Sequence, residues 1–353
     1  MKKPLALATM LIASGASHAQ SSVTVFGVID LAVQHARQAG NSVTRQNGIG
    51  GNQFSRLGFR GVEDLGGGWS AGFVLDAGLN LDTGAGALTS ADNLTTAGGG
   101  ALTFSRRSTV SLISKSWGEL RLGRDFVPTY WNLTGFDPFG SAGAGSVNNL
   151  AQGGLTRVST VQTAVRASNS IGYVLPGLHG FYGQAMHALA EGNGPSRQDG
   201  RYSGVRLGYA HAGWNLALAH GVTRLGTGDV STSNIGASYQ FAGIKAMAQV
   251  FRDSKEVVAA PNRSNGWLVG AQINAGPGYI PLSYSRVSDN SASDRQAKQL
   301  AVGYVYNLSR RTALYSTYSR LQNRNGAALT GGGVPGVANA AWTGLDIGMR
   351  HSF

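Results

Sequence analysis

Residues 300–308 read LAVGYVYNL, and large apolar side chains stand at every second position of this stretch. These apolar residues are Leu300, Val302, Tyr304, Tyr306 and Leu308. A period of two is that of a β-strand, because successive side chains of a strand point to opposite faces of its sheet. The same alternation recurs at 72–76, 235–241 and 344–353. The sequence therefore predicts an all-β chain whose strands have one apolar face and one small or polar face.

A soluble β-sandwich and a transmembrane β-barrel both produce this alternation, and the lengths of the connections distinguish them. Seven short turns recur at 63–68, 115–118, 176–180, 210–213, 241–243, 275–278 and 307–311. Eight longer polar stretches alternate with them at 37–51, 77–100, 125–160, 188–201, 223–233, 252–266, 287–298 and 320–341. Fifteen connections predict a 16-stranded antiparallel transmembrane β-barrel with both chain ends on the short-turn side.

Residues 1–19 are typical of a signal peptide. Two lysines precede an apolar stretch at 5–13, and Ser-His-Ala at 17–19 forms a small-x-small cleavage site. The apolar stretch is shorter than the roughly 20 residues that a membrane-spanning helix needs, so an uncleaved anchor is disfavoured. We therefore expect export and a mature chain, residues 20–353, that forms one β-barrel domain.

The composition excludes several classes of protein. The chain has no cysteine, so disulfide bridges cannot stabilise it, and 13% charged with 42% hydrophobic residues indicates neither disorder nor a helical membrane protein. Cleavage removes two of the 29 basic residues and no acidic one, leaving +10 of the formal net charge of +12. No basic run with interleaved aromatic residues is present, which disfavours nucleic acid as the partner and leaves anionic lipid or anionic solutes.

No constellation of catalytic or metal-binding residues stands out. The seven histidines are scattered without metal-ligand spacing, and no Gly-x-Ser-x-Gly motif occurs. The adjacent carboxylates Glu63 and Asp64 fall in a tight turn. We therefore expect neither an enzyme nor a cofactor.

Several motifs, spread from the mature start to the last residue, resemble those of the general porins of β-proteobacteria. They are QSSVTVFGVID at 20–30, SRLGFRGVEDLGGG at 55–68, GELRLGR at 118–124 and the terminal Phe353. The closest likeness is to the anion-selective porins of comamonad-type bacteria. The resemblance implies a homotrimeric outer-membrane barrel, a third long loop folded into the lumen, and recognition of Phe353 by the barrel-assembly machinery. Early strands and the second loop are the expected subunit interface.

The third long stretch, 125–160, is the candidate constriction loop. Its apolar side chains Trp131, Leu133, Phe136 and Phe139 would be costly in water, which favours packing against the inner wall over an exposed flap. Asp137 lies in its middle.

Arginines fall on positions that alternation assigns to the lumen. If Leu57 and Phe59 face lipid, then Arg56 and Arg60 point inward. On the sixth strand the same reasoning turns Arg166 inward with Ser168 and Ser170, and on the third strand it turns Asp76 inward.

The family resemblance places an arginine cluster of the constriction at Arg56, Arg106 and Arg166. Alternation on the fourth strand favours Arg107 over Arg106, so both stay candidates, and Arg124 is a further one. Asp76 and Asp137 are the candidate opposing carboxylates. The alternative reading is that the arginines only pair with acids for stability.

These observations predict an outer-membrane pore for passive diffusion of small hydrophilic solutes, with a preference for small anions. The expected partners are two further copies of the chain, outer-membrane lipid including lipopolysaccharide, and the barrel-assembly machinery. Three alternatives stay open: an adhesin or structural barrel with a blocked lumen, an outer-membrane enzyme, and a specific channel for phosphate or a dicarboxylate.

Overall fold

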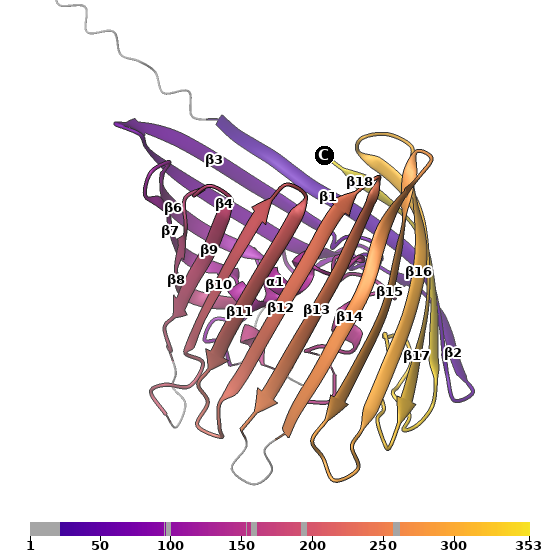
Figure 1. The fold of residues 1–353 in the computed structure, drawn as a ribbon. Helices are drawn as coiled ribbons and strands as arrows, with labels where there is room; N and C mark the ends of the chain where they lie inside the picture. Colours follow the sequence, from indigo (N-terminus) through magenta and orange to yellow (C-terminus); the bar gives the residue numbers. More distant parts are fainter. Residues whose placement is uncertain are drawn as a thin grey trace, which may run out of the picture.

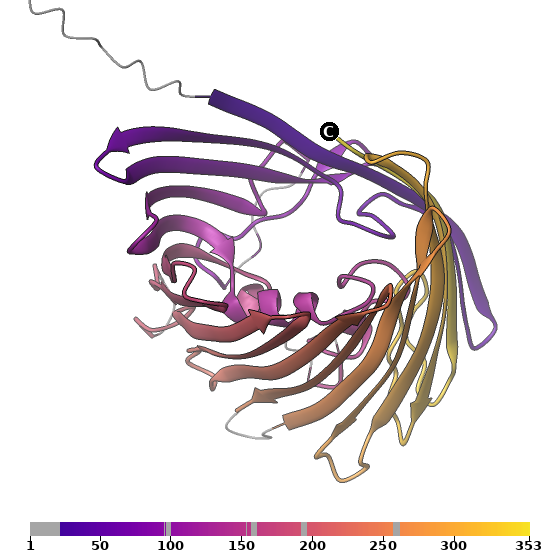
Figure 2. The same ribbon diagram turned by 45° about the horizontal axis from the view of Figure 1, so that its top comes forward.

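A computed structural model describes residues 22–94, 96, 100–152, 154–156, 161–191, 196–256 and 262–353. The expected signal peptide at 1–19 lies outside the described residues. The strands form one continuous antiparallel sheet, which closes on itself because β1 (Ser22–Gln38) pairs with β18 (Trp342–Ser352). Figures 1 and 2 show the resulting barrel from the side and tilted toward its short-turn end.

Sixteen strands make up the barrel, as predicted. Between β1 and β18 they are β3 (Arg56–Gly66), β4 (Trp69–Asn80), β6 (Arg107–Ser114), β7 (Gly118–Phe126), β8 (Arg166–Val174), β9 (Phe181–Ala188), β10 (Tyr202–His211), β11 (Trp214–Thr223), β12 (Val230–Phe241), β13 (Ile244–Lys255), β14 (Asn262–Ala275), β15 (Gly278–Asp289), β16 (Gln296–Asn307) and β17 (Thr312–Arg324). Two shorter strands lie in the connections: β2 (Asn41–Asn47) and β5 (Ala85–Gly86).

The alternating pattern separates the outside of the barrel from its lumen. On β16, Leu300 and Val302 expose 57% and 47% of their surface on the outside, whereas Gln299 and Ala301 are fully buried on the inside. Because every second residue of such a strand faces lipid, an apolar outer face and a small or polar inner face are the sequence signature of this architecture.

Several connections are shorter than expected because the strands run past the apolar belt. The expected long stretches at 223–233 and 287–298 shrink to 224–229 and 290–295, and β2 forms a hairpin with β1 inside the expected stretch at 37–51. In these extensions the outward positions are polar, as at Ser231 and Ser288, while Val230 and Val287 are buried on the inner face. The apolar-out pattern therefore ends while the backbone ladder continues. The short turns match the predicted positions closely, and both ends of the described chain lie at that end (Figure 1).

The third loop, residues 127–165 between β7 and β8, folds into the barrel. It begins with helix α1 (Pro128–Gly135), which contacts β9 to β12, and continues through the short helices η1 (Val147–Asn149) and η3 (Gln162–Ala164). Among the described residues, no helix has the length and apolar character needed to cross a bilayer. The loop starts and ends later than the predicted 125–160, because β7 continues to Phe126 and η3 precedes β8.

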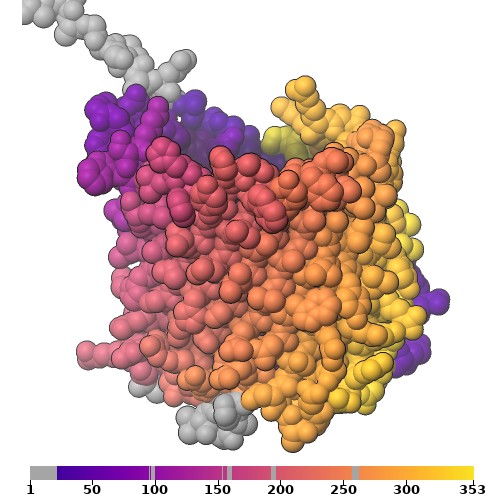
Figure 3. All heavy atoms as spheres, viewed as in Figure 1, coloured from indigo at the N-terminus to yellow at the C-terminus, as the bar shows by residue number. Residues whose placement is uncertain are grey.

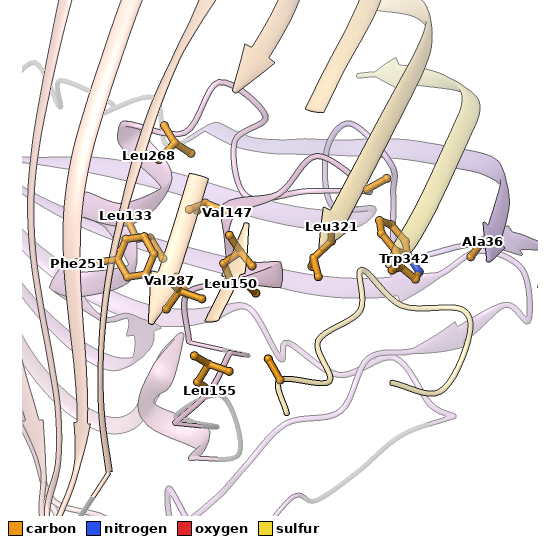
Figure 4. Packing of buried hydrophobic residues seen from close by; sticks show 14 of the residues in the cluster. Ala36, Leu133, Val147, Leu150, Leu155, Phe251, Leu268, Val287, Leu321 and Trp342 are labelled. Atoms are coloured by element: carbon orange, nitrogen blue, oxygen red, sulfur yellow. The ribbon is translucent and has the colours of Figure 1, made fainter. Parts of the chain in front are cut away.

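The main hydrophobic cluster joins this loop to the inner wall (Figure 4). Leu133, Val147 and Leu150 of the loop are almost fully buried and pack with Phe251 of β13 and Leu268 of β14. The barrel therefore holds its apolar core against one side of the lumen, and the other side stays open for a pore.

Candidate functional site

The third loop and the opposite wall enclose a cavity of about 560 Å³ inside the barrel. Strands β1, β3, β4 and β6 supply one side of it: Phe26, Arg56, Arg60, Val74, Asp76 and Arg107, with Arg106 just before β6. The loop supplies Tyr130, Trp131, Thr134, Pro138, Phe139 and Gly140. Gln272 of β14, Tyr279 of β15 and Phe126 of β7 also line it, as do Asn52, Gln53 and Phe54 before β3. This is the narrow, mixed polar and aromatic passage that an infolded loop produces.

Polar side chains of the inner wall hold the loop in place through its backbone. Gln249 donates to the carbonyl groups of Leu133 and Phe136 at 3.3 and 3.2 Å, and Gln272 donates to that of Pro138 at 2.7 Å. Farther along the loop, Asp346 accepts a hydrogen bond from the Ala144 amide at 2.8 Å. The inner face therefore carries amides and carboxylates because the loop backbone, which has no sheet partner, needs them.

Three of the four arginines that line the cavity, Arg56, Arg60 and Arg106, share its basic side with the carboxylate of Asp76. Arg106 Nε lies 3.2 Å from Asp76 Oδ2, and Asp76 Oδ1 is buried without a hydrogen-bond partner among the described residues. Arg56 donates to the Phe54 carbonyl at 3.1 Å and lies within electrostatic range of Arg106. Arg60 is exposed to the lumen.

Aromatic rings support these guanidinium groups. Arg60 lies 5.4 Å from the centroid of the Phe26 ring, and Arg106 lies 5.6 and 5.3 Å from those of Phe54 and Phe126. The negative face of an aromatic ring attracts a cation without removing its charge. The rings can thus position these arginines while leaving their field directed at the lumen.

Arg107 has a different environment, although it also lines the cavity. It lies 3.6 Å from Glu119 and 3.7 Å from Asp125, and both acids also bind Arg121, at 2.7 and 3.0 Å. Arg106 and Arg107 both line the cavity, so neither of these two candidates excludes the other. Arg106 precedes the first residue of β6, so strand alternation does not fix its direction.

Arg166 and Arg124 stand behind the cavity lining rather than in it. Arg166 packs on the Phe126 ring, 4.4 Å from its centroid, and its Nε is buried without a partner in the described chain. Arg124 donates to the Ser105 carbonyl at 2.7 Å and to Ser168 Oγ at 2.8 Å.

Simple alternation fails on β8 for a local reason. Asn169 has a positive φ of 57°, and the pairing of β7 with β8 shifts register between Gly123 and Asp125. Such a β-bulge inserts one extra residue, which changes the face to which the preceding residues point. Arg166 and Ser170 therefore cannot be assigned to one face by counting, and Ala167 is instead buried in the cluster around Phe126.

Asp137 does not face the lumen, contrary to the expectation that it opposes the arginines. Its side chain is 3% exposed and accepts hydrogen bonds from the amides of Phe139, Ser141 and Val147, each at 3.0 Å. Burial raises the pKa of Asp137 to about 6. Asp137 therefore stabilises the turn of the loop. A short polar residue beside a proline is as typical of a buried turn-stabilising residue as of an exposed residue, so the sequence did not distinguish the two.

Two contributors to the site were not among the predicted residues. Trp131, expected to pack against the wall, is 39% exposed and lines the cavity. Arg350 donates to Asn52 at 2.8 Å and lies within electrostatic range of Arg56. The alternation at 344–353 already placed Arg350 on the polar face, so that signal was present in the sequence.

The terminal Phe353 sits at the barrel seam. Its backbone exchanges hydrogen bonds with Gly27 at 3.0 and 3.1 Å, and its ring approaches so closely that a Cβ on Gly27 would lie 2.4 Å from it. The last residue is thus an integral part of barrel closure.

Comparison with known proteins gives matches over most or all of the chain. The family model described as Gram-negative porin matches residues 6–326. Outer membrane porin protein 32 of Delftia acidovorans is 35% identical and the major outer membrane protein P.IB of Neisseria lactamica is 24% identical, each over 100% of both chains.

Comparison with solved structures also finds outer-membrane proteins of the same fold. The anion-selective porin from Comamonas acidovorans has a TM-score of 0.82 and 33% identity, covering 95% of this chain and 100% of that one. A loop-deletion mutant of OmpT from Vibrio cholerae has a TM-score of 0.67 at 13% identity, covering 94% and 99% of the two chains, which is a likeness of fold alone.

Proposed function

Because the chain belongs to the Gram-negative porin family, whose members are outer-membrane diffusion channels, we propose that arginines at its constriction make the pore prefer small anions. Arg56, Arg60 and Arg106 act directly on the passing ion, and Arg166 reinforces them from behind Phe126. The solutes are small and hydrophilic and cross by passive diffusion. No chemical step or cofactor enters the mechanism.

One observation carries this proposal: Arg56, Arg60 and Arg106 line the cavity with Asp76 as the one carboxylate among its described lining residues, while the charge of Arg107 is balanced by Glu119 and Asp125. A unit charge about 5 Å from an ion contributes about 0.8 kcal/mol even at the dielectric constant of water. A difference of about 1.4 kcal/mol already changes a relative rate tenfold. Two or three uncompensated guanidinium groups therefore suffice for a measurable preference.

The test is the reversal potential across a salt gradient in a planar bilayer. Replacing Arg56, Arg106 and Arg166 together by glutamine should lower the ratio of anion to cation permeability about tenfold while the barrel stays folded. An unchanged reversal potential would refute the proposal. Absence of any conductance in the unmodified protein would instead favour a blocked structural barrel, and saturable block by phosphate or a dicarboxylate would favour a specific channel.

Partners of the barrel belong to the same proposal. The outer faces of β1, β3 and β6 carry exposed Val25, Val62 and Val110, which suits packing of these early strands and the second loop against two further copies of the chain. A trimer form is described for OmpT of Vibrio cholerae. Unheated, detergent-extracted protein should migrate as a trimer, and migration as a monomer would contradict this assembly.

Two further partners follow from residence in the outer membrane. The barrel-assembly machinery reads Phe353, and deletion of this residue should reduce the amount of inserted barrel. The outer wall contacts membrane lipid, including lipopolysaccharide.

A further inference from the structure

The outer wall of the barrel becomes polar beyond its apolar belt, toward the long loops at the bottom of Figure 1. The outward positions there carry His187 of β9 and His220 of β11, together with Arg201 just before β10 and Arg224 just after β11. They line a pocket of about 480 Å³ together with Ser203. This wall is the face seen in Figure 3.

An apolar groove of about 720 Å³ lies on the same outer wall, spanning β9 to β14. Leu207, Leu218, Ile235, Val250 and Trp267 are among the side chains that line it. Along the strands the two features follow directly on each other, because outward residues are spaced by two. Leu207 comes two positions after the pocket residue Val205, and Leu218 comes two positions before His220.

One of the two arginines of the pocket lacks a matching acid within the described residues. Arg224 pairs with Asp229, but no ion pair involves Arg201 within the described ranges, and its Nε is buried without a hydrogen-bond partner there. His187 and His220 use Nδ1 to contact Ser203 at 2.9 Å and Ser233 at 2.8 Å, so Nε2 is the ring nitrogen left for a ligand. A buried donor without an acceptor is costly, and an anion in the pocket would satisfy it.

We propose that this wall binds one phosphorylated lipid of the outer leaflet, with a phosphate at Arg201, His187 and His220 and acyl chains in the apolar groove. An apolar groove that ends in a basic pocket complements a molecule with an anionic head and apolar tails, as basic pockets on other membrane proteins complement phosphorylated headgroups. Phosphate supplies several strong acceptors, which suits converging nitrogen donors. The assignment rests on the proposed outer-membrane location and is independent of ion selectivity.

Binding of bisphosphorylated lipid A to the full-length protein in detergent, followed by native mass spectrometry, tests the proposal. The variant Arg201→Gln/His220→Gln should bind at least about tenfold more weakly than the unmodified protein, since charge-assisted hydrogen bonds are lost. The matched control is Arg310→Gln/Arg311→Gln, which removes two exposed cations from the short turn at the other end of the barrel and should leave binding unchanged.

Three results would overturn the assignment: equal binding by the Arg201→Gln/His220→Gln variant, equal binding of dephosphorylated lipid A, or inorganic phosphate bound as tightly as the lipid. If that variant does not show the heat-dependent mobility of a folded barrel, His187→Gln/His220→Gln replaces it. Conductance and reversal potential of the variants should match those of the unmodified protein. Failure of lipid binding is therefore distinguishable from failure of the proposed channel function.

Discussion

Two groups of arginines lie on the same inner wall of the barrel, and they differ in how their charge is balanced. The open group consists of Arg56, Arg60 and Arg106 with the single carboxylate Asp76. Its arginines contact aromatic rings and a backbone carbonyl more than they contact acids. Most of its positive charge therefore has no acidic partner in the described part of the chain.

The paired group consists of Arg107, Arg121, Glu119 and Asp125. Two cations and two anions bind one another within 3.7 Å, so their fields largely cancel a short distance away. From this comparison we expect the local balance of charge, rather than the number of arginines near the pore, to set the ion preference. Removal of charge should then matter only in the open group.

The largest effect is expected from Arg56→Gln/Arg106→Gln, which removes two charges of the open group. The ratio of anion to cation permeability should fall about tenfold, because each charge acts on anion and cation with opposite sign. Reversal potentials of single channels measure it. A permeability ratio within twofold of that of the unmodified protein would contradict the claim that the open group, unlike the paired group, sets the ion preference.

A smaller change of opposite sign is expected from Asp76→Asn. The amide oxygen can still accept a hydrogen bond from Arg106, but the negative charge is lost, so the anion preference should rise about threefold. The same recordings report it. A lower anion preference would mean that Asp76 acts by positioning Arg106 rather than by its charge.

Arg166→Gln should reduce the preference by less than about twofold, since its charge lies behind Phe126 and outside the cavity lining. Comparison with Arg56→Gln in the same recordings shows how the effect of a charge on the permeability ratio depends on its distance from the cavity. An effect of Arg166→Gln as large as that of Arg56→Gln would place its guanidinium at the ion path.

The smallest effect is expected from Arg107→Gln/Glu119→Gln, which removes one cation and one anion of the paired group together. Net charge is unchanged and Arg121 keeps Asp125 as its partner, so the permeability ratio should stay within experimental scatter. A shift comparable to that of Asp76→Asn would show that the paired group is not electrostatically silent.

The barrel, and the direction in which several candidate site residues point, could be predicted from the sequence for a physical reason. Alternation such as that at 300–308 reports a lipid-facing surface, and Arg56, Arg60 and Asp76 lie on strands where that alternation is regular. Wherever contact with lipid produces the apolar alternation, the position of a residue in the strand predicts whether its side chain faces the lipid or the lumen.

The direction of a side chain could not be predicted from the sequence where backbone geometry, rather than contact with lipid, decides which way it points. Arg166 precedes a bulge at Asn169, and Asp137 lies in a loop whose hydrogen bonds are internal. Trp131 follows the first turn of α1, where a period of two does not apply. None of these features leaves a periodic signal in a single sequence, so the composition of the loop indicated burial without saying which side chain remains exposed.

The reversal potential of the unmodified protein, recorded at low and high ionic strength, tests the central claim most directly. At about 0.1 M salt the Debye length is about 10 Å and the open group should impose a clear anion preference, whereas at 1 M it falls to about 3 Å and most of the preference should vanish. A cation preference at low salt, or an anion preference that does not weaken with added salt, would contradict selection by the uncompensated charge of Arg56, Arg60 and Arg106.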